Sequence, residues 1–264
     1  MVRRDFLAGL PALPILAAEW QSSGPSTASV PVIYEWRQYS LRTGTQPRRL
    51  ADYLQNALIP ALNRLGHTPV GVFEVTFGLP SPTVFVLTPF ADAAALAAKE
   101  SLLDKDDAFA RAAAPYLDAP ATDAVYLRQE VSVLSAFPQV PRVVVPPATA
   151  TKGPRLFELR TYESHNERAH RAKVKMFAEM GEIDIFRRAG LAPVFFARTL
   201  AGPRMPSLVY MLVHENMAGR EKSWDNFRND PDWRKLSATP GFTDPDIVSN
   251  ITTVFLRPAA YSQI

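Results

Sequence analysis

Two short stretches of the chain carry residue types that could bind or transform a small molecule. In each, Glu, Arg and Tyr stand at alternate positions: Glu35, Arg37 and Tyr39 form the first trio, and Glu158, Arg160 and Tyr162 form the second trio. Because alternate residues of a β-strand share one face, each trio should present its side chains together. An Arg fork and a Tyr hydroxyl could hold a carboxylate or phenolate and donate a proton to it.

A structural role for the two trios is the interpretation that the residue types favour. Neighbouring Glu and Arg side chains neutralise one another as an ion pair, and Tyr packs beside them. A binding site would need donor groups that such a pair leaves free. The sequence therefore gives two hypotheses for the same residues: a closed ion pair, and a clamp for an anionic ligand.

Few other residues are candidates for catalysis, cofactor binding or metal binding. His214, which ends a predicted strand, is the best single candidate for a ligand or base. His165 and His170 are five residues apart and so lie on different faces of a helix, which makes them a poor metal pair. The chain has no Cys, and no metal cluster, Gly-rich phosphate loop or Ser nucleophile is evident. We therefore expect no metal and no cofactor.

The composition predicts a folded protein and argues against a nucleic-acid partner. The chain has 264 residues, of which 47% are hydrophobic, enough for a substantial core. Lys and Arg number 29 against 26 Asp and Glu, and the basic residues are scattered among acidic ones rather than clustered. Beyond the N-terminus no segment is apolar and long enough to span a membrane.

The N-terminus has the pattern of a twin-arginine export signal. Arg3 and Arg4 lead into an apolar run that continues to Ala18 and is followed by small residues. Cleavage is expected after Ala18 or Ala28. The alternative is a frayed cytoplasmic N-terminus that happens to hold two arginines. The order of charge, apolar run and small residues favours export to the periplasm, without a stable membrane span.

The elements that must position the trios belong to a domain that the chain contains twice. Five blocks recur in one order: 34–39 as 157–162, 64–70 as 188–194, 82–87 as 206–211, 106–109 as 230–233, and 125–128 as 254–257. One such match would be chance, but five in the same order indicate a duplication.

Each copy shows hydrophobic patterns that alternate between strand and helix periods. The first copy is predicted to have strands near 32–40, 70–76, 83–88 and 125–134, and helices over 47–65 and 92–117. The second is predicted to have strands near 156–162, 194–200, 208–214 and 251–256, and helices over 166–189 and 218–236. The order β-α-β-β-α-β is that of a ferredoxin-like α+β domain, with helices on one face of an antiparallel sheet.

A Pro-rich segment separates the two copies. We expect an export signal and linker in residues 1–29, a first domain in 30–135, a linker in 136–153 and a second domain in 154–264. The prolines of the segment between the copies predict a stiff, extended connection.

The second copy resembles a NIPSNAP domain. The likeness rests on 157–162 (Phe-Glu-Leu-Arg-Thr-Tyr), on 220–233 with its Asp-Pro-Asp-Trp, and on 255–262 with its Arg-Pro. The first copy keeps its trio and the Arg-Leu-Gly turn but lacks the other two segments. The resemblance implies the dimeric α/β-barrel superfamily, in which two ferredoxin-like sheets meet on their bare faces. Two copies in one chain would close that barrel internally.

Physical reasoning leads to the same barrel. A sheet with one uncovered face must bury it, and a second copy on a short tether is at high effective concentration. We expect eight strands to form the barrel. Trp36 and Leu159, which alternate with the trio residues, should then face the helices. The two trios and His214 should line a cavity inside the barrel.

Three functions stay open at this point. Superfamily relatives include cofactor-free monooxygenases of aromatic polyketides and haem-handling enzymes, so the resemblance implies a small apolar or aromatic ligand in the barrel cavity. The alternatives are a non-enzymatic interaction or scaffolding protein and a cofactor-independent monooxygenase-like enzyme. A cavity of roughly 300 Å³ lined by the trios favours a ligand, whereas a filled interior favours an interaction protein. The sequence does not decide whether the chain is an enzyme or a homo-oligomer.

Overall fold

The computed structural model describes residues 32–264. The predicted export signal and its cleavage sites lie outside the described residues. Within residues 32–264, no helix combines the length and the apolar character that crossing a membrane requires.

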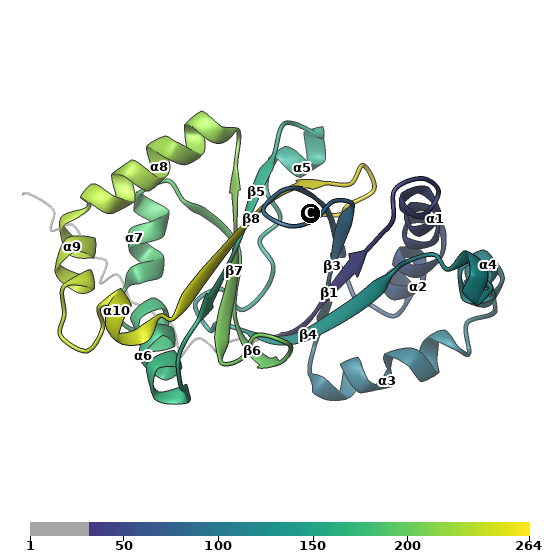
Figure 1. Cartoon of the computed structure of the whole chain (residues 1–264), viewed down its shortest axis with the longest axis horizontal. Coiled ribbons are helices and arrows are strands. Elements are labelled where there is room, and N and C mark those ends of the chain that lie inside the picture. Colours follow the sequence, from purple (N-terminus) through teal and green to yellow (C-terminus); the bar gives the residue numbers. More distant parts are fainter. Residues whose placement is uncertain (1–31) are drawn as a thin grey trace, which may run out of the picture.

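Eight antiparallel strands close into a barrel at the centre of the molecule (Figure 1). Around the barrel the order is β1-β3-β2-β8-β5-β7-β6-β4. The strands of the first half are β1 (Ile33–Ser40), β2 (Gly71–Phe77), β3 (Thr83–Phe90) and β4 (Arg128–Ala136). Those of the second half are β5 (Leu156–Glu163), β6 (Ala192–Ala201), β7 (Ser207–His214) and β8 (Asn250–Pro258). The two halves join where β2 pairs with β8 and β4 pairs with β6.

The helices form two groups on opposite sides of the barrel (Figure 1). The first half contributes α1 (Gln46–Tyr53), a π-helical stretch (Leu54–Leu58), α2 (Ile59–Arg64), α3 (Ala93–Leu103), α4 (Asp107–Leu117) and a 3-10 turn (Ala121–Asp123). The second half contributes α6 (Glu167–Ala178), α7 (Glu182–Arg188), α8 (Met217–Asn229), α9 (Pro231–Ser237) and α10 (Asp244–Ile247). Each group packs on the outer face of its own strands.

All eight predicted strands are present, but three predicted helices are each divided in two. The breaks after α3 and α8 occur where Asp106 and Asp230 accept backbone N–H bonds at the start of the next helix. Arg64 donates to Asp106 at 3.0 Å, and Arg188 donates to Asp230 at 2.8 Å. The repeated Arg and Asp blocks of the sequence are therefore paired structural caps.

The segment between the copies is more structured than an extended connection. It contains the short helix α5 (Ala148–Thr151). Val140 is buried, and Val144 donates its backbone N–H to Val194 of β6 at 2.8 Å. Val143 packs against the apolar side chains inside the barrel. This segment thus helps to cover one end of the barrel.

The barrel interior is a packed apolar core. Every strand contributes to it, with side chains that include Tyr34, Trp36, Phe73, Phe85, Leu134, Phe157, Leu159, Phe195, Met211 and Leu256. The prediction that Trp36 and Leu159 face the helices, with the trios inside, is wrong. Large apolar side chains from all eight strands fill the interior where the two bare sheet faces meet. The charged trio residues lie on the outer face, where helices supply partners.

We expect Phe157→Ala to lower the free energy of unfolding by about 3–5 kcal/mol, because removing a fully buried ring leaves a cavity in the core. The Phe157 ring meets Phe73 of the other half at 4.9 Å between centroids. Phe77→Ala is the matched control, since that ring is 61% exposed, and its expected change is below about 0.5 kcal/mol. Chemical denaturation of the full chain measures both. Equal losses would contradict the packed barrel core.

Candidate functional site

The first trio is a closed ion pair. Arg37 donates from Nε to Glu35 at 3.0 Å and from Nη1 to the Tyr39 hydroxyl at 3.2 Å. Lys99 of α3 donates to the other oxygen of Glu35 at 2.6 Å. Each member of this trio is thus satisfied by a neighbour, as the structural interpretation predicts.

The second trio differs because side chains of helix α8 donate hydrogen bonds to its carboxylate, Glu158. Arg220 donates to both oxygens of Glu158, at 2.9 and 2.8 Å, and Trp224 donates its indole N–H at 2.8 Å. His214 Nε2 lies 3.3 Å from Glu158 Oε2. Burial alone would raise the pKa of Glu158, but these neighbours outweigh it and hold that pKa at about 2.

Arg160 consequently makes only a long hydrogen bond to Glu158. Its Nη1 lies 3.5 Å from Glu158, at the limit of a hydrogen bond, and its buried Nε has no partner among residues 32–264. The guanidinium lies 4.6 Å from the ring centroid of Trp224 and 5.4 Å from that of Tyr162. Arg160 is thus a planar cation beside two aromatic rings, with one N–H donor that has no partner among residues 32–264.

The difference between the halves can be traced to two positions on one helix. The repeated blocks at 106 and 230 set a spacing of 230 − 106 = 124 residues. Arg220 and Trp224 therefore correspond to Leu96 and Glu100, neither of which can donate a side-chain hydrogen bond to a carboxylate. The same trio is thereby a closed pair in the first half and an open one in the second.

A cavity of about 250 Å³ lies where the second trio meets the helices. We call it the outer pocket. It is lined from β5 by Arg160 and Tyr162, from α6 by Lys173, from α7 by Glu182 and Phe186, from α8 by Arg220, Trp224, Phe227 and Arg228, and by Trp233, Asp244 and Ile251. It therefore combines aromatic walls with several ionisable groups, a common composition for small-molecule sites.

Buried acid–base groups lie on one side of the outer pocket. Lys173 Nζ is 3.4 Å from Asp244 Oδ1 and 3.6 Å from Glu182 Oε2. That Glu182 oxygen has no hydrogen-bond partner among residues 32–264. Burial raises the pKa of Glu182 to about 7, against the opposing effect of Lys173. Burial also raises the pKa of Tyr162, whose hydroxyl accepts a bond from Tyr210 at 3.3 Å.

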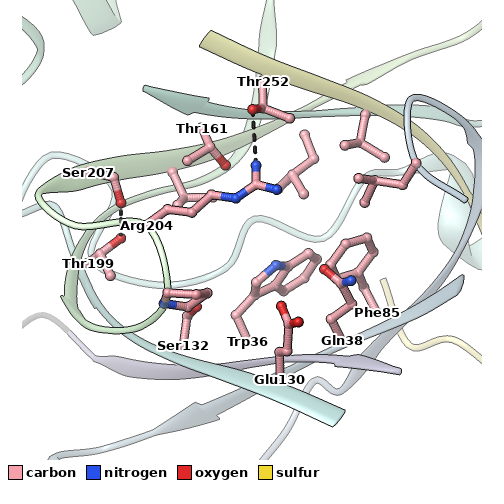
Figure 2. Close-up of a pocket in the computed structure, with 15 residues that line it drawn as sticks. Trp36, Gln38, Phe85, Glu130, Ser132, Thr161, Thr199, Arg204, Ser207 and Thr252 are labelled. Carbon is pink, nitrogen blue, oxygen red and sulfur yellow. Dashed lines mark hydrogen bonds between the residues drawn. The ribbon is translucent and has the colours of Figure 1, made fainter. Parts of the chain in front are cut away.

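The open end of the barrel holds a much smaller space. Figure 2 shows Trp36, Gln38 and Glu130 on one wall, with Arg204 reaching over them from the β6–β7 hairpin toward Thr252. Arg204 donates to Thr252 Oγ1 at 3.0 Å. The free volume is only about 70 Å³, whereas a cavity of about 150 Å³ is known to hold benzene. The barrel interior thus lacks the cavity that the sequence led us to expect.

The structure divides the sequence-predicted site residues among three places. Arg160 and Tyr162 line the outer pocket, and Glu158 and His214 lie directly behind it. Glu35 and Arg37 of the first trio border a space of about 80 Å³ beside α3, whereas Tyr39 is packed in the core of the first half. Within residues 32–264 no group of three or more His, Asp or Glu could hold a metal ion.

The helix residues that line the outer pocket were not predicted from the sequence. Lys173, Glu182 and Asp244 come from three helices that only the tertiary fold brings together. Arg220 and Trp224 could have been found, because alignment of the two copies shows these as positions where they diverge.

We expect Glu182→Gln to become more stable relative to the wild type as pH rises from about 5 to 8. The folded wild type holds the Glu182 proton up to a pH of about 7, whereas the unfolded chain releases it at lower pH. The free energy of unfolding of the wild type therefore falls over this range. Gln does not titrate. Denaturation curves at several pH values give the difference in unfolding free energy between the two proteins. A difference that is independent of pH would contradict the buried, raised carboxyl group.

The fold matches proteins of very low sequence identity. A candidate monooxygenase from Lactobacillus acidophilus NCFM is 9% identical, with 86% of this chain and 94% of the other covered and a TM-score of 0.57. A candidate monooxygenase from Fusobacterium nucleatum is 10% identical, with 87% and 93% covered and a TM-score of 0.52. An anthrone oxidase-like protein is 6% identical, with 88% and 93% covered and a TM-score of 0.52. At these identities the likeness shows the fold alone.

Sequence comparison gives a more specific result. No curated protein sequence matches the chain. The NIPSNAP family profile, however, matches twice, over residues 34–136 and again over residues 157–263. The two matches cover both halves of the barrel and coincide with the internal repeat. The chain therefore belongs to the NIPSNAP family, as a protein with two tandem NIPSNAP domains.

Proposed function

We propose that the protein binds a small aromatic anion in the outer pocket. The observation that carries this proposal is that the buried Nε of Arg160 has no partner among residues 32–264. The carboxylate of the trio, Glu158, is instead bound by Arg220 of α8. A carboxylate or phenolate would supply the missing acceptors with charge-assisted hydrogen bonds. This keeps the ligand class that the sequence suggests and moves its site from the barrel interior to the outer face.

The balance of charges in the pocket favours an anion. Glu158 is neutralised by Arg220, and Asp244 faces Lys173 at 3.4 Å. Arg160 then shares Glu158 with Arg220, through an ion pair of 3.5 Å, while the remaining carboxyl group of the pocket, Glu182, has a pKa of about 7 and is partly protonated at neutral pH. A neutral ligand without an acceptor would leave the buried Nε–H of Arg160 unsatisfied, which is unfavourable.

The walls of the pocket favour a flat ring. Phe227 packs against Trp233 at 4.4 Å and against Trp224 at 5.5 Å between ring centroids. Aromatic pairs of this kind accept a further ring in stacked or edge-on geometry. The volume of about 250 Å³ lies just below the range of about 300–1,000 Å³ that is typical of larger ligands. We therefore propose a single-ring compound.

Two other functions keep some support. The filled barrel interior, with about 70 Å³ free, is what an interaction or scaffolding protein would show. A cofactor-independent, monooxygenase-like activity would need an acid–base group beside a bound aromatic compound, and Glu182 occupies such a place.

We further propose that each half is a ferredoxin-like domain, as its sequence predicts. The strand orders β4-β1-β3-β2 and β8-β5-β7-β6 support this description, since the same positions of the two copies occupy the same places.

The proposed binding is tested with 3-phenylpropionate as the probe, by titration calorimetry on the full chain. We expect Arg160→Gln to weaken binding about 10- to 100-fold, because a charge-assisted hydrogen bond contributes about 1.5–3 kcal/mol. Arg37→Gln is the matched control at the equivalent position of the first half, and it should leave the affinity unchanged. Equal effects of the two substitutions, or no binding by the wild type, would refute the proposed site.

We also propose that the protein is exported by the twin-arginine route, on the strength of Arg3, Arg4 and the apolar run that follows. Replacing both by Lys in a bacterium that has this route should retain the precursor in the cytoplasm. Immunoblots of cell fractions measure the distribution. Unchanged export of the double variant would refute this route.

A further inference from the structure

We propose that the outer pocket also transfers protons, interconverting the keto and enol forms of an aryl-substituted 2-oxo acid, with Glu182 as the base and Arg160 holding the developing oxyanion. This inference rests on the proposed binding of an aromatic anion. It adds an activity to that binding and names the class of substrate.

Glu182 has the surroundings that a general base requires. It begins α7, lines the outer pocket, and leaves Oε2 without a hydrogen-bond partner among residues 32–264. Its charged neighbours include Lys173 of α6 at 3.6 Å and Asp244 of α10, whose Oδ1 lies 3.4 Å from the same Lys173 ammonium group. The cations Arg160 and Lys173 favour the carboxylate, whereas burial and Asp244 oppose it. The resulting pKa of about 7 leaves the base part ionised at neutral pH, which is where general bases work best.

Two groups on β5 can hold the negative charge that appears when the proton leaves. Arg160 offers its unpaired Nε. Tyr162 accepts a bond from the Tyr210 hydroxyl, so its own proton remains free to be donated into the pocket. Donors that already point at the position of the developing charge lower the barrier without reorganising. Base and donors are contributed by different elements of one cavity.

The chemical step needs no further reactant. The Glu182 carboxylate takes a proton from the carbon next to the ketone, and the electron pair of that C–H bond becomes the new C=C bond. The π electrons of the carbonyl group move to oxygen, where Arg160 and the Tyr162 hydroxyl stabilise the enolate. The proton that Glu182 has taken then passes to that oxygen to give the enol, or returns to carbon to restore the ketone, and either transfer regenerates the Glu182 carboxylate. Atoms and electrons balance, and nothing is oxidised.

The substrate class follows from the pocket. The aromatic ring of an aryl 2-oxo acid would lie against Trp224 and Trp233, and its carboxylate would supply the acceptor that the Nε of Arg160 lacks. The acidic C–H group lies between the ring and the carboxylate in such a compound. The first half offers no equivalent site, because the spacing of 124 residues places Leu58 at the position of Glu182.

Phenylpyruvate is the probe for the activity. In D2O, NMR follows exchange of its C3 protons for deuterium, and the exchange in buffer alone is subtracted. We expect the full-length wild type to raise the exchange rate at least about tenfold and Glu182→Gln to remove most of that increase. Glu182→Gln should still bind 3-phenylpropionate, which lacks the ketone, with nearly wild-type affinity. Glu74→Gln, on the opposite half at the surface, is the control and should exchange like the wild type.

The outcomes separate the two claims. If 3-phenylpropionate does not bind, the proposed function fails. If it binds but phenylpyruvate exchanges no faster than in buffer, only the proton transfer fails. Full activity in Glu182→Gln would also overturn the inference. Should that variant not fold, the pH profile of the wild type decides: the enzyme-dependent rate must rise with pH through about 7, and a flat profile would overturn the assignment of Glu182 as the base.

Discussion

The buried carboxylate of Glu158 determines how the second half of this protein differs from the first. A fully buried anion must be neutralised and hydrogen-bonded, and here α8 meets that requirement with Arg220 and Trp224. In the first half the equivalent carboxylate depends on Arg37 and Lys99. The choice of partner decides whether the trio's arginine is used within the fold or left available to a ligand.

The duplicated barrel makes this divergence possible. Both copies bury the same kind of apolar sheet face in one shared core, which Trp36, Phe157 and their neighbours form. The helix-covered outer faces are free to change independently. The first half has a closed ion pair beside a space of about 80 Å³, whereas the second has hydrogen-bond donors, an acid and aromatic rings around a cavity of about 250 Å³.

Much of the fold could be predicted from the sequence, because strand and helix periods and the five repeated blocks are local signals. Which face of each strand points into the barrel could not be predicted. Trp36 and Glu35 alternate in the same way whichever face is inside, and only the folded barrel shows that its interior holds the apolar side chains while the helix-covered face supplies partners for the charged ones. The site was predicted in part: Arg160 and Tyr162 line it, but Lys173, Glu182 and Asp244 are brought to it from separate helices.

The proposed function requires that an aromatic anion binds outside the barrel and not within it. A crystal of the protein with 3-(4-bromophenyl)propionate tests this most directly, because anomalous scattering locates the bromine without ambiguity. We expect one strong peak in the outer pocket near Trp224 and Trp233, with the carboxylate on Arg160. A peak at the barrel mouth beside Trp36 and Arg204, or no ordered bromine at all, would contradict the account.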